Sequence, residues 1–205
     1  IVETEYRILD GNDMTDRQLL QAAALDHKVY PREYWLEEQT VLGYLHARPE
    51  IYTYAVIGDN LIGYLNMSCI DRKSYMTLLD GEENDLCIDA SNILYPEAGR
   101  DNYLYFSSIV VDPDHRKAGI AGSLFSRFGE KLTYLRRKGI YFTDVIADAI
   151  SIHGEKLCLS FGMKLEKVTL YGGKLFRYPM ATGEPNKALD LFIKNLRGGN
   201  NGQAL

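Results

Sequence analysis

The chain has 205 residues, of which 46% are apolar and 25% charged, the proportions of one ordinary globular domain. Its formal net charge of −5 argues against a broad nucleic-acid surface, and no apolar run has the length of a membrane span or the form of a signal peptide. Three cysteines, Cys69, Cys87 and Cys158, are grouped neither with each other nor with histidines, which predicts a reducing, cytoplasmic location and no metal site.

The N-terminal part predicts a short strand, two helices and a β-hairpin, over residues 5–9, 16–29, 32–48, and 51–57 with 61–68. Thr15 is a suitable N-cap for the first helix, and Pro31 separates this helix from the second. Pro49 ends the second helix, because proline interrupts helical hydrogen bonding. The sequence Gly-Asp-Asn at residues 58–60 tolerates positive φ angles and forms the turn of the hairpin.

An acidic segment follows the hairpin. Residues 71–101 show no clear apolar period, and they include five carboxylates between residues 80 and 89: Asp80, Glu82, Glu83, Asp85 and Asp89. We interpret the segment as an insertion on the surface, whose ordinary form is a solvated loop. The alternative is a lid or rim whose negative charge attracts a cationic amine substrate.

The most informative stretch is a strand, a loop and a helix between residues 103 and 139. Residues 103–111 are rich in aromatic and β-branched side chains, which favour a buried strand, and Pro113 follows its end. Apolar residues then recur at steps of three and four, which predicts one apolar face of a helix: Ile120, Leu124, Phe128, Leu132 and Leu135. Gly139 is a natural end for this helix, after three cationic residues that the helix dipole favours.

The loop before that helix, residues 116–122, has the character of an anion site. The first amides of a helix have no intrahelical partner and lie at its positive end. Gly119, Ala121 and Gly122 have little or no side chain, so a phosphate can approach the backbone, and Arg116 and Lys117 add positive charge. The pattern is neither a Walker loop nor a dinucleotide-binding loop. An ordinary strand-to-helix turn with a solvated basic pair is the alternative.

The rest of the chain predicts a strand, a helix, a β-hairpin and a terminal helix, over residues 140–147, 152–161, 164–180 and 185–197. Ser151 can cap the helix that follows it, and Pro185 suits the first turn of the terminal helix. The expected division of the chain is a domain over residues 1–180, with the acidic insertion at 71–101, and a C-terminal helix and flexible tail over 181–205.

Two motifs and the order of the elements resemble the GNAT superfamily of N-acetyltransferases. The Arg-x-x-Gly-x-Ala pattern in residues 116–121 matches the family's acyl-CoA pyrophosphate loop. Residues 151–163 are similar to a second family segment, Asn-x-x-Ala-x-x-Leu/Phe-Tyr-x-x-x-Gly-Phe, with Ser151 in place of Asn and Cys158 in place of Tyr. The resemblance covers residues 5–180. It implies an α/β (α+β) fold, a mixed, mostly antiparallel central sheet flanked by helices, with a splayed strand pair that holds acyl-CoA.

The resemblance also implies acetyl-CoA as co-substrate, without a metal. Helix amides at the loop would bind the pyrophosphate, and free amides of the splayed strand would bind pantetheine and polarise the thioester carbonyl. The implied reaction is direct attack of a neutral amine on that carbonyl. The expected CoA-binding residues are Ile109, Val110, Val111, Arg116, Lys117, Ala118, Gly119, Ile120, Ala121, Gly122 and Ser151.

The acid and the base of such a reaction are less clear from the residues. In the family, the Tyr at the position of Cys158 often protonates the departing thiolate; a thiol could replace it, or Cys158 is simply a small buried residue. An ammonium substrate must first lose a proton to a carboxylate, a His or a water chain. Asp144 is our candidate base and Asp148 a second, while Ser107 and Ser108 could orient water.

The sequence therefore predicts an acetyl-CoA-dependent N-acetyltransferase that acts on an amine of a small molecule or peptide. A non-catalytic acyl-CoA-binding or sensing module is the alternative, because Ser151 and Cys158 depart from the family pattern. The net charge of −5 disfavours transfer to aminoacyl-tRNA. We expect acetyl-CoA and an amine acceptor as partners, with neither a membrane nor nucleic acid, and a homodimer is compatible with the sequence.

Overall fold

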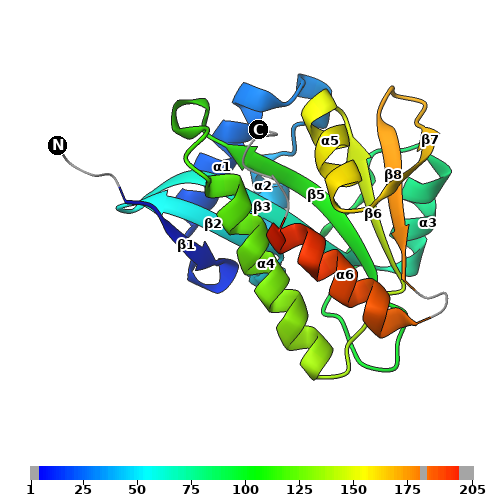
Figure 1. Cartoon of the computed structure of the whole chain (residues 1–205). Coiled ribbons are helices and arrows are strands. Elements are labelled where there is room, and N and C mark those ends of the chain that lie inside the picture. Colours follow the sequence, from blue (N-terminus) through cyan, green and yellow to red (C-terminus); the bar gives the residue numbers. More distant parts are fainter. Residues whose placement is uncertain (1–4, 181–183, 199–205) are drawn as a thin grey trace.

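One mixed sheet lies at the centre of the computed structural model, which describes residues 5–180 and 184–198 (Figure 1). Its strand order is β1-β2-β3-β5-β6-β8-β7, with β4 paired to β3. Among these described strands, the only parallel pair is β5 with β6. The strands are β1 (Arg7–Asp10), β2 (Tyr52–Ile57), β3 (Asn60–Ile70), β4 (Ile93–Leu94), β5 (Tyr103–Val111), β6 (Asp144–Ala149), β7 (Lys164–Val168) and β8 (Lys174–Pro179).

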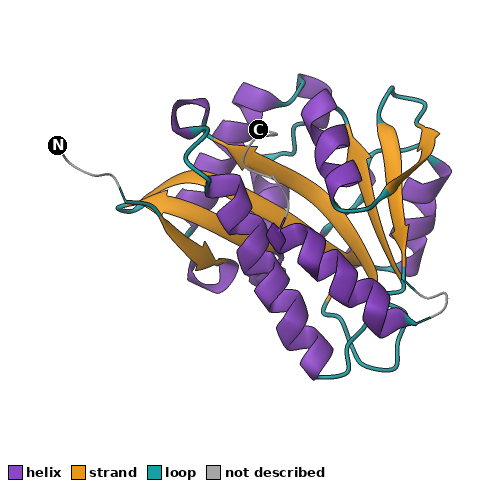
Figure 2. Cartoon of the chain, in the orientation of Figure 1, coloured by secondary structure: helices purple, strands orange, loops and turns teal. Residues whose placement is uncertain are grey.

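Helices cover both faces of the sheet (Figures 1 and 2). Apolar residues of α1 (Asp16–Val29), α2 (Glu38–Ala47) and α3 (Arg72–Asp80) form a core on one face. Residues of α4 (Ile120–Arg137), α5 (Ile152–Ser160) and α6 (Pro185–Gly198) form a second core on the other. The predicted fold class, a mostly antiparallel sheet flanked by helices, is thus confirmed. None of the described helices is long and apolar enough to cross a membrane.

Predictions that rest on local signals are confirmed. The Thr15 hydroxyl accepts a hydrogen bond from the Gln18 amide, and the Gln18 side chain accepts one from the Thr15 amide, so a capping box begins α1. Ser151 caps α5 by accepting from the Gly154 amide at 3.1 Å. Gly139 has a φ angle of 75° after the end of α4, as expected of the residue that ends a helix.

The predicted helix over residues 32–48 is wrong in its first third. Residues 32–34 form a 3-10 turn, Trp35 is extended, and the α-helix begins only at Glu38. The Trp35 indole N–H donates to the Tyr30 carbonyl at 2.8 Å, and its ring stacks on His27 with centroids 3.9 Å apart. These contacts hold the segment against the end of α1, and they override the helical pattern of the sequence.

The acidic segment is also more ordered than a solvated loop. Nine of its residues, Arg72–Asp80, form α3, and the helix begins where Asp71 accepts from the Ser74 amide at 2.7 Å. Tyr75 and Leu78 of this helix are buried in the core, and so is Ile88 beyond it. The helix is short and has one narrow apolar stripe, which explains why no period was evident. The interpretation as a solvated loop is therefore wrong for residues 72–80.

Two further boundaries differ from expectation. The strand predicted at residues 140–147 begins at Asp144 and continues to Ala149, because its register is set by parallel pairing with β5 from Tyr103 onward. The terminal helix forms as predicted, but it belongs to the core: Leu189, Phe192 and Leu196 are fully buried in the same apolar cluster as α4. Residues 199–205, where we expect a flexible tail, lie outside the described residues.

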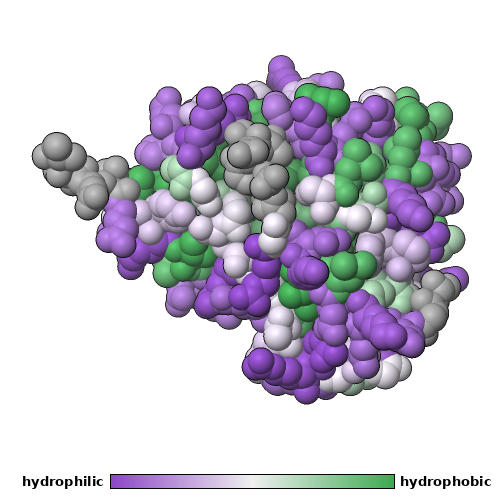
Figure 3. Space-filling model, in the orientation of Figure 1, coloured by the Kyte–Doolittle hydropathy of each residue, from purple (hydrophilic) through white to green (hydrophobic). Residues whose placement is uncertain are grey.

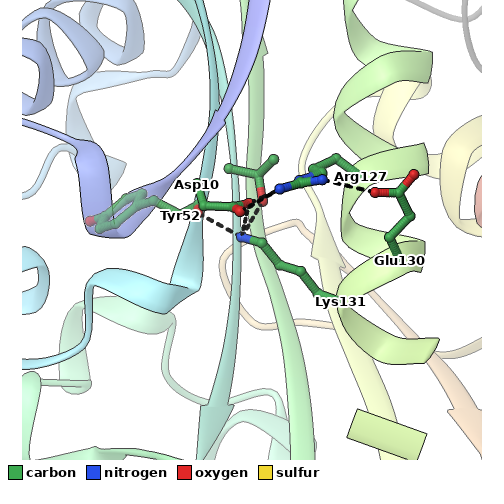
Figure 4. A network of polar contacts seen from close by, with 6 residues as sticks. Asp10, Tyr52, Arg127, Glu130 and Lys131 are labelled. Carbon is green, nitrogen blue, oxygen red and sulfur yellow. Dashed lines mark hydrogen bonds and ion pairs between the residues drawn. The ribbon is translucent and has the colours of Figure 1, made fainter. Parts of the chain in front are cut away.

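Ion pairs fix α4 against the edge of the sheet (Figure 4). Arg127 and Lys131, one turn apart on α4, both pair with Asp10 at the end of β1, at 2.7 and 3.2 Å. The Lys131 ammonium also donates to the Tyr52 carbonyl and to Thr53 Oγ1 on β2. Lys131 is largely withdrawn from water and fully bonded there, so this network fixes the position of the helix whose N-terminus follows the predicted anion loop.

The face that carries α4 and α6 is mainly hydrophilic (Figure 3). Apolar side chains gather on it near α5 and the β7 edge of the sheet. The exposed large apolar residues of α5, of β7 and of the turn after β7 are Ile152, Leu159, Leu165, Val168 and Leu170. β7 pairs only with β8 in the described sheet, so it is an edge strand, and the end of α3 lies beside it: the Lys167 ammonium donates to the Asp80 carbonyl at 3.1 Å.

Candidate active site

β5 and β6 separate within the sheet. Their parallel pairing begins at Tyr103 with Asp144 and ends at Phe106 with Ala147, although β5 continues to Val111. At the same point β5 contains a β-bulge: Phe106 pairs with Met67 of β3 and Ser108 with Asn66, which leaves Ser107 as the extra residue. A bulge bends its strand and increases the local twist, so β5 turns away from β6 there.

The separation leaves backbone groups of β5 without a strand partner. The Asp112 amide donates to the Ile62 carbonyl at 2.8 Å, so Asp112 faces β3. Backbone groups of successive residues point to alternate sides of a strand, so the amides of Ile109 and Val111 point toward the gap beside β6. Val110 faces β3 instead. The predicted amides of the splayed strand are therefore available at two of the three expected positions.

The loop before α4 exposes the first amides of that helix. Gly119 is the N-cap, with a φ angle of 80° and no side-chain hydrogen bond to the helix amides. Lys117 has a φ angle of 65°, a conformation that costs energy for a residue with a side chain. Ile120 and Ala121 are buried below, so they fix the helix end, whereas residues 116–119 are exposed. Gly119 of the Arg-x-x-Gly-x-Ala pattern thus supplies the left-handed turn. Ala121 of the same pattern is small because it lies in the core.

A cavity of about 310 Å³ runs through the gap between the two strands. From the α4 side it is lined by Arg116, Ser151 and Cys158, and from the α1 side by Tyr30, Tyr64 and Asp26. Phe106, Ser107, Ser108 and Ile109 of β5 lie between the two groups. Of the predicted CoA-binding residues, Ile109, Arg116 and Ser151 line the cavity together with Cys158, whereas Val110, Val111 and residues 117–122 lie outside its lining.

Cys158 lines the cavity as a buried thiol. Its side chain is 2% exposed, on the face of α5 that packs against the core. Burial, with a smaller contribution from the negative charge of Asp148, raises the pKa of the thiol to about 12. An ordinary cysteine has a pKa of about 8.5, so this thiol is neutral at physiological pH and holds its proton tightly.

Asp144, our candidate base, lies outside this group of residues. It is 1% exposed, its Oδ2 atom pairs with Arg177 Nε at 2.5 Å, and the Tyr75 hydroxyl donates to the same atom. Burial raises the pKa of Asp144, and these two partners oppose the shift. The carboxylate does not line the cavity and belongs to a structural ion pair. Asp148, four residues further along β6, lines the cavity.

Two carboxylates that the sequence did not single out as catalytic join Asp148 in the cavity. They are Asp26 of α1 and Asp85, which lies in a 3-10 turn (Asp85–Cys87) of the acidic segment. Burial raises the pKa of Asp26 to about 7 and that of Asp85 to about 6, and it raises the pKa of Asp148. The Tyr64 and Tyr105 hydroxyls oppose the shifts of Asp26 and Asp85 by donating to these carboxylates, and Tyr171 opposes the shift of Asp148. No sequence signal distinguishes Asp26 from a solvated acid on an amphipathic helix.

A chain of hydrogen bonds connects Asp26 to the splayed strand. The Tyr64 hydroxyl donates to Asp26 Oδ1 at 2.5 Å and lies 3.2 Å from the Ser108 hydroxyl. Ser108 is in turn 3.0 Å from the Tyr30 hydroxyl, which donates to the Ile109 carbonyl at 3.3 Å. Ser108, predicted as a residue that orients water, therefore belongs to a polar network that reaches the open side of β5.

No protein-family model and no curated protein sequence matches the chain. The fold, however, is similar to that of several solved structures. The loading GNATL domain of CurA from Lyngbya majuscula has a TM-score of 0.59, with 13% identity over 85% of this chain and 98% of that domain. PaiA N-acetyltransferase from Thermoplasma acidophilum, in complex with coenzyme A, has a TM-score of 0.53, with 11% identity over 85% of this chain and 99% of that one.

Naa50 from Arabidopsis thaliana, in complex with the bisubstrate analogue CoA-Ac-MVNAL, is similar as well, with a TM-score of 0.54 and 10% identity over 84% of this chain and 97% of that one. The chain therefore has the GNAT fold, as the sequence predicts.

Proposed function

We propose that the protein is an acetyl-CoA-dependent N-acetyltransferase that transfers the acetyl group to an amine by direct attack. One observation carries the proposal: β5 splays from β6 and leaves its Ile109 and Val111 amides without a strand partner, beside a helix N-terminus that has no side-chain cap. PaiA and Naa50, which share the fold, were solved with coenzyme A and with a CoA-containing analogue. Acetyl-CoA is then the co-substrate and supplies the activated acetyl group.

The residues present fit such a co-substrate. The amides of residues 117–122 would hold its pyrophosphate at the positive end of α4, next to the Arg116 side chain. The amides of Ile109 and Val111 would hold the pantetheine arm and polarise the thioester carbonyl. In a site closed to water, such fixed donors stabilise the charge that develops on the carbonyl oxygen.

The amine must arrive at the thioester without its proton. Asp148 lies in the cavity close enough to Cys158 to influence its pKa, and its Oδ1 atom is buried without a hydrogen-bond partner. Its raised pKa makes it a stronger base than an ordinary aspartate, so we assign it the general-base role. Cys158, whose pKa is about 12, is a weaker acid than an ordinary thiol, so it contributes little to protonating the departing thiolate.

The test is release of free CoA from acetyl-CoA over a panel of amines, read with a chromogenic disulfide. Cys87, the exposed cysteine of the described chain, is first replaced by Ser to remove background reaction. Arg116→Ala should weaken CoA binding about tenfold by calorimetry. Arg137→Ala, the same charge change at the opposite end of α4, is the matched control and should not. Protein that binds no CoA contradicts the proposal, and protein that binds CoA but acetylates no amine is a sensing module instead.

Location in the cytoplasm and a homodimer stay predictions. So does the extent of the acyltransferase domain over residues 1–180, although α6 packs into its core.

A further inference from the structure

Three carboxylates, Asp26, Asp85 and Asp148, share one cavity without a cationic partner. They come from α1, from the acidic segment and from β6, and none forms a salt bridge among the residues that the structure describes. Within the described lining of the cavity, the one arginine is Arg116, which belongs to the loop before α4. Carboxylates withdrawn from water without counter-charge are unfavourable, so this part of the cavity suits a cation.

The three carboxylates lie in a row. Asp26 accepts from Tyr64 of β3, Asp85 accepts from Tyr105 of β5 at 3.2 Å, and Asp148 is part of β6. β3, β5 and β6 are neighbours in the sheet. Tyr64 pairs with Val110, five residues along β5 from Tyr105, so Asp26 is also displaced from Asp85 along the strand direction.

Two observations agree with a row. In the described part of the chain, no group of three His, Cys, Asp or Glu side chains is gathered tightly enough to hold a metal ion. The charge of Asp148 raises the pKa of both Cys158 and Asp85, and the charge of Asp85 raises that of Asp26. The order from the thioester side outward is therefore Asp148, Asp85, Asp26.

We propose that the acceptor is a linear dicationic amine, with its reacting nitrogen at Asp148 and its second ammonium between Asp85 and Asp26. This inference rests on the proposed function and names the substrate class of the same site. Tyr34 and Tyr105 also line the cavity, and tyrosine rings attract ammonium groups. A monoamine or a peptide N-terminus carries one cation, which leaves carboxylates of the row without a partner.

The first experiment compares 1,4-diaminobutane and spermidine with n-butylamine and a short peptide as acceptors. We expect kcat/KM to be at least a hundredfold higher for the two polycations than for n-butylamine. With CoA present, the polycations should also raise the melting temperature, whereas n-butylamine should not. Equal or better use of n-butylamine or the peptide overturns the inference but leaves the N-acetyltransferase assignment intact. Acetylation of no amine at all counts against the assignment itself.

The second experiment uses Asp26→Asn and Asp85→Asn, which keep the acceptors for Tyr64 and Tyr105. Each should lower the ratio of kcat/KM for diaminobutane to that for butylamine at least tenfold. Glu82→Gln makes the same charge change in the acidic segment, but outside the cavity lining, and should leave the ratio unchanged. An unchanged ratio in both aspartate variants overturns the inference. A similar fall in the Glu82 variant does the same, because it indicates a diffuse field rather than a row of contacts.

Discussion

Replacing Asp26 by Asn isolates the free energy of holding a carboxylate in this cavity. In the folded protein burial raises the pKa of Asp26 from 3.8 to about 7, a difference of about three units. The folded state therefore binds the Asp26 proton more tightly than the unfolded state does between about pH 4 and pH 7. At 1.36 kcal/mol per unit, the free energy of unfolding falls by up to about 4 kcal/mol as the pH rises through that window.

The amide of the Asp26→Asn variant does not titrate, but it still offers an oxygen to the Tyr64 hydroxyl, so the contact seen at 2.5 Å is kept. The free energy of unfolding of this variant relative to the wild type should therefore increase by up to about 3 kcal/mol between pH 4.5 and pH 8. Urea unfolding followed by circular dichroism, without ligands, measures this difference, and subtraction removes the contribution of titrating groups that do not interact with Asp26. Glu82→Gln, which removes an exposed carboxylate outside the cavity lining, is the control for the change of charge.

A difference for Asp26→Asn that stays within about 0.5 kcal/mol across the range would refute the reasoning, because it would mean that the carboxylate is solvated and ionises normally. Saturating diaminobutane should flatten the pH dependence of the wild type, since a bound cation restores the ordinary preference for the charged form.

Three further predictions concern the CoA-binding loop, Cys158 and Asp148. Gly122 is helical and has open space for a methyl group, so Gly122→Ala should raise stability by up to about 1 kcal/mol in thermal unfolding. The same variant should weaken CoA binding in calorimetry. Gly119 is less suitable for this test, because a side chain at its positive φ angle would also reduce stability. Unchanged CoA affinity would place the pyrophosphate elsewhere. Cys158→Ala should slow turnover less than about tenfold, below the usual contribution of a general acid, and a hundredfold loss with CoA binding retained would show that the thiol is the acid. A Cβ atom at Gly173 would lie 2.2 Å from Asp148 Oδ1, so Gly173→Ala should displace that carboxylate and reduce kcat as Asp148→Asn does, while sparing CoA affinity; a normal kcat would exclude Asp148 as the base.

The amino-acid sequence by itself determines the elements whose signals are local. Thr15 and Ser151 cap helices where they should, and the apolar period of residues 120–135 predicts α4. The Arg-x-x-Gly-x-Ala loop can be predicted from the sequence for the same reason, because the positive φ angle at Gly119 and the free amides depend on only a few consecutive residues. Such interactions join neighbours in the chain, so their residue types can be read in order.

Only the tertiary structure decides which acids face the site. Asp144 and Asp148 lie on one strand, yet contacts from Arg177 and Tyr75 make the first a structural partner and leave the second in the cavity. Asp26 becomes a cavity residue because Tyr64, on a strand far along the chain, holds its carboxylate. The pairing of β5 with β3 leaves Ser107 as a bulge, and β5 separates from β6 at this point. Each result depends on contacts between segments remote in sequence, and the free energy of a carboxylate is set by how far those segments exclude water from it.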